Sequence, residues 1–196
     1  MLIFLKATIQ VLTSIIGILF FLPVIILFGI VVFIEDGKPL FFIQNRVGKQ
    51  KKIFKIYKIR TLKIDTPSVG SHLIGKNAVL MSGKLSRKFK IDEFPQLINV
   101  IKGDLNLVGP RPCLENQEDL IAERQVLDIF SIKPGITGLG QVLKYDMKEP
   151  KLLAMVDKIF IDNDSMILRL KILISTFSKF YRNDLQKLVD QNLKYF

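Results

Sequence analysis

The pattern of hydrophobic and polar positions divides the chain after its first 36 residues. Ala7 to Ile34 carries no charged side chain, whereas charged residues recur throughout the rest of the chain. This run exceeds the ~20 apolar residues that a bilayer-spanning helix needs. Pro23 removes a backbone donor near its middle, so we expect a kink at Leu22-Pro23. A kinked helix can cross a membrane, or enter it and return to the same face.

The apolar run could also be a signal peptide, or an ordinary single span. A signal peptide has an apolar region of about 7–15 residues that ends at a small-residue cleavage site, and Val31 to Ile34 offers none, so we expect the helix to be retained. Positive charge marks the cytoplasmic side of short flanks. Both flanks carry it, which suits a re-entrant helix with both ends on the cytoplasmic face, although a single span stays open; the flanking cations are Lys6, Lys38, Arg46, Lys49, Lys51 and Lys52.

The part that follows the apolar run alternates strand and helix patterns. Residues 39–60 predict a β-hairpin, with strands over 40–43 and 53–59 and a turn over 47–50. Glycine and proline predict a mobile loop over 61–83. Residues 85–101 have helical spacing. Because Pro95 must lie in the first turn of any helix it joins, Ile91, Asp92 or Glu93 should be a helix N-cap.

The C-terminal half predicts turns over 103–112, a helix over 115–130, a loop over 133–141 and an amphipathic helix over 166–181. That last helix can lie in a membrane interface or pack on a core. Its apolar face comprises Ile167, Leu170, Leu173, Ile174, Phe177 and Tyr181. We therefore predict an α+β, mostly helical fold, with residues 1–36 as a membrane helix and residues 37–196 as one small cytosolic domain.

The charge balance indicates an anionic partner. Lys and Arg number 29 against 18 Asp and Glu, a net charge of +11. The partner could be phospholipid, a phosphorylated substrate or nucleic acid, and the apolar run favours the first two. A basic stripe with interleaved aromatics could bind RNA, but beside a membrane it more plausibly meets anionic lipid; it comprises Lys49, Lys51, Lys52, Phe54, Lys55, Tyr57 and Lys58. Single copies of Cys113 and His72 exclude an internal disulfide and a His/Cys zinc cluster, and we interpret both as structural.

The adjacent carboxylates Asp92 and Glu93 are the main candidates for chemistry. At a helix start both can border one anion site, where one attacks and the other orients a metal or accepts a proton. A solvated cap pair is the alternative. Arg111 stands between Pro110 and Pro112, whose rings stiffen the backbone. An arginine held in this way suits bidentate binding of a phosphate. Pairing with a structural carboxylate is its alternative.

Several other residues offer weaker signals. Arg87, Lys88 and Lys90 precede the carboxylates and could line an anion site or stay solvated. The glycines at 135, 138 and 140 are not a dinucleotide fingerprint. We interpret them as a tight-turn loop, although they could also let a backbone approach a ligand closely.

Taken in order, these strings resemble the small monotopic phosphoglycosyl transferases, a family of bacterial sugar transferases. The resemblance runs from the apolar helix to about Thr176 and is carried by residues 42–48, 54–61, 90–100, 102–112 and 133–142. It implies transfer of a phospho-sugar from a UDP-sugar to polyprenol (undecaprenyl) phosphate on the cytoplasmic face of the bacterial inner membrane, with release of UMP. It implies initiation of glycoconjugate synthesis, phospholipid contact through interfacial helices, and no nucleic-acid partner.

The resemblance also implies individual roles. Asp92 matches the family's nucleophile, which takes up the phospho-sugar covalently, and Glu93 matches its partner; both are expected to hold Mg²⁺. Leu22-Pro23 matches the family's helix-breaking position. We expect the remaining matched residues to bind substrate phosphates: Lys58, Arg60, Arg87, Arg111 and Gln141.

The sequence departs from the family pattern at a few positions. Leu143-Lys144-Tyr145 follows the glycine-rich string where some members have an arginine, so a role for Lys144 stays open. Arg169 replaces a usual aspartate, which removes a possible structural salt bridge. Leu22 replaces a common serine and cannot offer a hydroxyl to the carbonyls freed by Pro23. The sugar, the glycan and the oligomeric state are not determined by the sequence.

Overall fold

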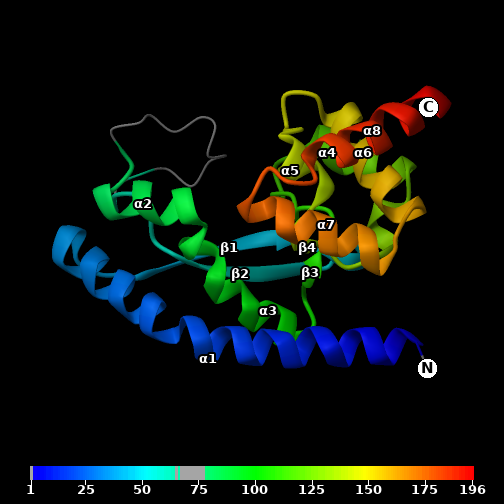
Figure 1. Cartoon of the computed structure of the whole chain (residues 1–196). Coiled ribbons are helices and arrows are strands. Elements are labelled where there is room, and N and C mark those ends of the chain that lie inside the picture. The colour runs from blue at the N-terminus through cyan, green and yellow to red at the C-terminus, as the bar shows by residue number, and fades with distance from the viewer. Residues whose placement is uncertain (1, 65, 67–77) are drawn as a thin grey trace. The chain divides into compact units, whose positions relative to one another are not determined.

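The structure is a computed structural model that describes residues 2–64, 66 and 78–196, without side chains before residue 7. His72 and much of the predicted loop over 61–83 lie outside the described residues. The chain is mostly helical and forms two compact units (Figure 1). Unit 1 comprises Met1–Asn45 and Lys55–Gly103, and unit 2 comprises Arg46–Phe54 and Asp104–Phe196. The expected division into a membrane helix over 1–36 and one domain over 37–196 stays a prediction.

Helix α1 (Leu2–Asp36) carries the apolar run. It is helical throughout and contains Pro23. Within the described part of the chain, residues Ala7–Asp36 are the one segment long and apolar enough to cross a membrane. Figure 1 shows α1 as one unbroken helix whose axis changes direction along its length. A kink at Leu22-Pro23 and a return to the same membrane face stay predictions.

One face of α1 packs against the rest of unit 1, and the other faces are exposed. Ser14, Ile25 and Val32 are buried, whereas apolar side chains such as Phe20 and Ile34 are about three-quarters exposed. Helix α3 (Leu97–Lys102) lies along α1 (Figure 1). Gly17 permits this close approach, because a Cβ there would lie 3.2 Å from Leu97 Cδ1. Small residues at contacts are usual where membrane helices pack, and the exposed apolar surface suits lipid.

The acidic end of α1 organises the elements that follow it. Helix α2 (Met81–Phe89) has no side-chain cap of its own at Leu80. Instead the Glu35 carboxylate accepts hydrogen bonds from Met81 N, Ser82 N and Ser82 Oγ. These bonds satisfy amide groups that the first turn of a helix leaves without partners. The end of the membrane helix therefore fixes where α2 begins.

The predicted hairpin is confirmed, with β1 (Phe41–Val47) and β2 (Ile53–Ile59) joined through the short η1 helix (Lys49–Lys51). The helical spacing over 85–101 corresponds to three consecutive helices. Lys90 adopts a left-handed conformation with φ of 57° and separates α2 from η4 (Ile91–Gln96), which α3 follows. Pro95 lies inside η4.

Unit 2 is built around two short parallel strands that the sequence pattern did not predict. β3 (Asn106–Val108) pairs with β4 (Gly135–Thr137), with Asn106 opposite Gly135 and Val108 opposite Thr137. The turn over 103–112 and the loop over 133–141 are therefore partly wrong. Helices α4 (Glu118–Val126) and η5 (Ile129–Ser131) lie within the helix predicted over 115–130, and α7 (Met166–Phe177) is shorter than the helix predicted over 166–181. The other helices were not predicted: α5 (Leu139–Leu143), α6 (Pro150–Asp162), α8 (Arg182–Asn192) and η6 (Leu193–Tyr195).

Helix α7 buries the face opposite to the predicted apolar face. Leu168, Ile172 and Ser175 are buried. Most of the predicted face is exposed instead, at Ile167, Leu170, Ile174 and Phe177. The helix is thus apolar on both sides, since Leu168 and Ile172 join the main core of unit 2.

Packing at Gly83 gives a test of unit 1. A Cβ at this position of α2 would lie 2.3 Å from the backbone oxygen of Thr61. We expect Gly83→Ala to destabilise the protein by on the order of 1–3 kcal/mol, as overpacking does. Gly29→Ala is the matched control, because its Cβ would meet only Leu40 Cδ1 at 3.8 Å. Thermal unfolding in detergent micelles measures both, and equal melting temperatures would contradict this packing.

Candidate active site

The candidate site begins where α2 ends. Lys90 closes α2 in its left-handed conformation and is the N-cap of η4, which places Asp92 and Glu93 in the first turn of η4. The predicted N-cap at Ile91, Asp92 or Glu93 is therefore wrong by at least one residue. Because a single residue separates α2 from η4, the two carboxylates follow directly on the basic end of α2.

Glu93 forms an ion pair with Lys58 of β2. Lys58 Nζ donates to Glu93 Oε1 over 3.0 Å, and the two side chains are 15% and 12% exposed. A partly buried pair is screened less by solvent than a surface pair. The contact brings together residues 35 positions apart that the sequence had placed in one site.

Asp92 is buried, with 8% of its surface exposed. Burial raises its pKa above the ordinary value of 3.8, and the charge of Glu93 raises the pKa further. Lys58 and Arg87 act in the opposite direction and lower it by less. Asp92 is thus a carboxyl group withheld from water beside two cations, whose charges favour its ionised form.

Arg87 and Arg60 differ in their contacts. Arg87 Nε donates to Thr61 Oγ1 over 2.9 Å, which fixes the base of its guanidinium at the α2 end. Arg60 is buried and holds the end of α1: its Nη2 donates to the backbone oxygens of Asp36 and Gly37, and its Nη1 lies 3.1 Å from Asp36 Oδ2. The sequence did not indicate these roles for Arg60 and Thr61.

A magnesium ion would find few protein ligands here. No group of three or more His, Cys, Asp or Glu side chains gathers among the described residues. Mg²⁺ usually takes one or two carboxylates from the protein and its other ligands from phosphates and water. Asp92 and Glu93 fit that donor set.

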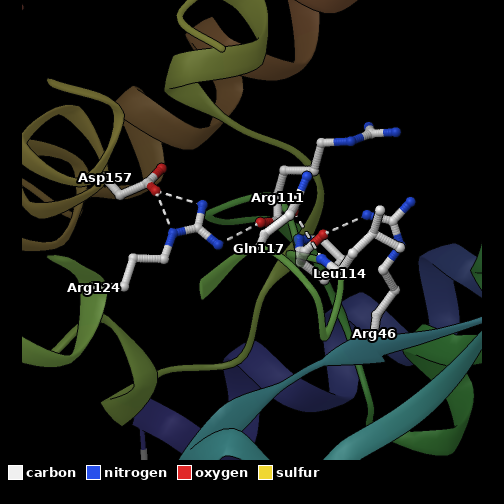
Figure 2. A network of polar contacts seen from close by, with 7 residues as sticks. Arg46, Arg111, Leu114, Gln117, Arg124 and Asp157 are labelled. Carbon is white, nitrogen blue, oxygen red and sulfur yellow. Dashed lines mark hydrogen bonds and ion pairs between the residues drawn. The ribbon is translucent and has the colours of Figure 1, made fainter. Parts of the chain in front are cut away.

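Arg111 belongs to unit 2. Figure 2 shows its side chain pointing away from Arg124 and Asp157, while its backbone oxygen accepts a hydrogen bond from Arg124 Nη1 over 2.8 Å. Pro112 O accepts another from Arg46 Nη1 over 3.0 Å. No local motif marks Arg124, which was not a candidate from the sequence. Arg46 lies in the string 42–48 that carries the resemblance, but no contact with the Arg111 segment was predicted for it.

Gln141 lies on α5 in unit 2 beside the glycine-rich string. Its Nε2 donates to Ile136 O over 3.3 Å, and its buried Oε1 has no partner among the described residues. The glycines serve close packing: a Cβ at Gly135 would lie 2.1 Å from Gly109 N. Lys144 ends α5 in a left-handed conformation.

Two further predictions concern Cys113 and the basic stripe that includes Lys58. Cys113 is buried, and burial raises the pKa of its thiol, so the site favours the structural interpretation of this residue. Lys58 turns inward to Glu93 and is not part of a uniform basic stripe. The exposed lysines of the hairpin turn are Lys49, Lys51 and Lys52.

A long exposed apolar helix ahead of a buried carboxylate in a cationic corner is the arrangement of a membrane-associated enzyme that handles phosphates. The bacterial sugar transferase family model matches residues 1–183. The chain therefore belongs to the bacterial sugar transferase family.

Curated relatives agree with this assignment. An "Uncharacterized sugar transferase EpsL" from Bacillus subtilis (strain 168) is 43% identical over 86% of this chain and 83% of its own length. A UDP-N-acetylgalactosamine-undecaprenyl-phosphate N-acetylgalactosaminephosphotransferase from Aeromonas hydrophila is 32% identical over 88% of this chain. A UDP-glucose:undecaprenyl-phosphate glucose-1-phosphate transferase from Caulobacter vibrioides is 36% identical over 62%. The chain spans less than half the length of the latter two.

The raised pKa of Asp92 predicts a stability effect. The folded state binds the Asp92 proton more tightly than the unfolded state does, so this stabilisation is complete below pH 3.8 and is lost as pH rises through the raised pKa. Asp92→Asn keeps the side chain neutral and should melt at a higher temperature than wild type at pH 7, with the difference shrinking toward pH 3.8.

Asp162→Asn removes an exposed carboxylate from α6 and is the matched control. We expect it to change stability by less than about 0.5 kcal/mol, as an exposed pair does. A lower melting temperature of Asp92→Asn than of wild type at pH 7 would contradict the sign of the Asp92 shift.

Proposed function

We propose that this protein transfers a sugar phosphate from a UDP-sugar to undecaprenyl phosphate, releases UMP, and so begins the assembly of a glycoconjugate. The observation that carries the proposal is the buried Asp92 carboxylate beside Glu93, Lys58 and Arg87. Family membership and the names of the Aeromonas and Caulobacter relatives support both the acceptor and the donor class.

In the first step an Asp92 carboxylate oxygen attacks the phosphorus nearest the sugar. A bond forms between Asp92 and that phosphorus, and the bond to the bridging oxygen of the diphosphate breaks. UMP leaves with the electron pair of that bond. The product is a phospho-sugar held on Asp92 as an acyl phosphate, a known product of carboxylate attack.

In the second step a phosphate oxygen of undecaprenyl phosphate attacks the same phosphorus. The bond to Asp92 breaks, the carboxylate is regenerated, and the sugar leaves on the lipid as a diphosphate. Division into two steps lets one nucleophile serve a soluble donor and then a lipid acceptor. Ping-pong kinetics follow.

The surrounding residues prepare Asp92 for attack. Lys58 and Arg87 oppose the effect of burial on its pKa and so keep a larger fraction of the carboxylate ionised. Lys58 also holds Glu93. Phosphate binding by Arg87, Arg111, Arg60 and Gln141 is proposed from the resemblance; the contacts of Arg60 with the end of α1 add a structural role.

Mg²⁺ is the proposed cofactor, and Asp92 and Glu93 would hold it. When bound, such an ion neutralises and polarises the diphosphate. This chain supplies the carboxylates and the Lys58 contact that orients Glu93.

The covalent step is tested by mixing the purified protein with a UDP-sugar and Mg²⁺ without acceptor. UDP-N-acetylgalactosamine, UDP-N-acetylglucosamine and UDP-glucose form the first panel, because two of these donors appear in relatives' names and N-acetylated hexoses are the expected class. We expect a burst of UMP and an intact-mass gain of one phospho-sugar for the correct donor.

Asp92→Asn should abolish the burst and the mass gain while remaining folded. Asp162→Asn, on exposed surface of α6, is the control and should retain both. Turnover near the wild-type rate in Asp92→Asn would refute the nucleophile, and a wild type that never forms an adduct would refute the covalent route.

We further propose that α1 enters the cytoplasmic leaflet and returns to the same face, with the exposed apolar side of α7 lying in the membrane interface. The exposed residues of α1 and α7 support lipid contact. The positive charge on both flanks of α1 supports a shared cytoplasmic location of its ends.

Cysteine labelling tests this topology in a Cys113→Ser background. Leu2→Cys and Lys38→Cys place single thiols near the two ends of α1, and Phe20→Cys serves as an apolar control that should resist labelling. An impermeant maleimide should label both ends in inverted vesicles and neither in intact cells. Labelling of the ends from opposite sides would establish a single span instead.

A membrane-anchored protein that binds lipid or RNA without catalysis is the alternative. The exposed lysines of the hairpin turn favour that class, but it predicts no phospho-sugar adduct and no UMP. A transferase of the polytopic type is a second alternative, and the single apolar segment of the described chain argues against it.

A further inference from the structure

The backbone around Arg111 is held at each successive carbonyl. Pro110 O accepts a hydrogen bond from Gly135 N over 2.9 Å, and Cys113 O accepts one from Val47 N over 3.0 Å. Between them, Arg111 O and Pro112 O accept from Arg124 and Arg46. Pro110, Pro112 and Cys113 are buried, and buried carbonyls need hydrogen-bond partners. These four bonds hold the loop within unit 2.

Arg124 has a buried partner that fixes its orientation. Its Nε and Nη2 both donate to Asp157 Oδ2, over 3.0 and 2.6 Å, and the side chains are 2% and 3% exposed. With these two donors committed, the remaining nitrogen Nη1 points at Arg111 O (Figure 2). The planar fork of an arginine carries donors on separate nitrogens that face both partners, whereas a lysine would have to reach both from one nitrogen.

The energetics suggest that this pair serves geometry more than stability. Removing two charges from water costs several kcal/mol, and apolar residues of similar volume often replace a buried pair without loss of stability. Burial raises the pKa of Asp157, and Arg124 opposes the rise. What apolar residues could not replace is the hydrogen bond to the Arg111 carbonyl.

The position of that carbonyl governs the side chain of Arg111. Because Pro112 follows it, Arg111 is restricted to extended backbone conformations. With its conformation restricted and its carbonyl held, the direction of its Cα–Cβ bond is fixed as well. The side chain points away from the Arg124–Asp157 pair (Figure 2).

We propose that Arg124, oriented by Asp157, is a positioning residue that aims the Arg111 guanidinium at a phosphate of the nucleotide substrate. This inference rests on the proposed function for the identity of the substrate. Arg46 supports the same segment one residue further on.

The test measures two quantities in the presence of Mg²⁺. One is the Kd for UDP, whose binding requires no reaction. The other is the KM for the donor that forms an adduct with the wild-type protein. Arg124→Lys keeps the charge but loses the fork. We expect it to weaken UDP binding and raise KM by roughly tenfold, the loss of one good hydrogen bond to a charged ligand, while kcat changes less.

A double-mutant cycle separates positioning from a structural role. Arg111→Met should itself weaken UDP binding, and adding Arg124→Lys to it should cause no further loss, because Arg124 would act through Arg111. Additive losses would overturn the proposal. Asp162→Asn, which breaks the exposed ion pair with Lys158 on the same helix as Asp157, is the control and should leave both constants unchanged.

The paired replacement of Arg124→Met with Asp157→Leu tests the same point in a variant expected to fold. It should retain the melting temperature of the wild type and lose UDP affinity. Unchanged affinity, or unfolding of every variant, would assign the pair to fold stability and overturn the proposal. If wild type forms no adduct while the UDP cycle behaves as expected, the covalent route fails and this inference stands.

Discussion

The burial of one ionisable carboxylate is the constraint on which unit 1 depends. Burial and the charge of Glu93 raise the pKa of Asp92, so both favour its neutral form. The fold offsets this cost by bringing Lys58 from β2 and Arg87 from α2 to the same corner. Each cation is in turn fixed by secondary structure that the end of α1 organises through Glu35, Asp36 and Arg60. Helix α1 and Asp92 are thus parts of one packed unit.

In unit 2 the side chains, or their absence at glycine, determine where the backbone lies. The glycines of residues 133–142 let β4 approach the Gly109 segment so closely that a Cβ at Gly135 would collide with it. Arginines then hold carbonyls that the two short strands leave outside their ladder. Arg169 follows this pattern, since it pairs with Asp164 and donates to Val108 O over 3.3 Å. Arg169 stands where the family pattern has an aspartate. The salt bridge expected of that aspartate is therefore replaced by the ion pair between Arg169 and Asp164.

The sequence predicted the features that depend on local pattern. The uncharged run gave α1, the β-formers around Gly48 gave the hairpin, and the order of the motifs led to Asp92 and Glu93. The prediction of secondary structure failed where the local pattern carries no distinct mark of the observed structure. Pro95 predicted a helix start at residues 91–93, one residue or more too late. The break at Lys90 itself is not marked by the periodicity of residues 85–101, since a lysine with positive φ leaves no trace there. The glycines of β4 were interpreted as turn residues because close approach and turning require the same amino acid.

Contacts between distant residues that no motif places in one site could not have been predicted from the sequence. Arg124 and Asp157 lie 33 positions apart on α4 and α6, and each alone looks like an ordinary charge on an amphipathic helix. Only the fold shows that both are removed from water and that their third contact is a carbonyl of the motif around Arg111. A motif names the side chains that meet a ligand, whereas the residues that aim those side chains are dispersed. Transfer of a phosphoryl group depends on alignment as well as charge, so such dispersed residues belong in any account of the site.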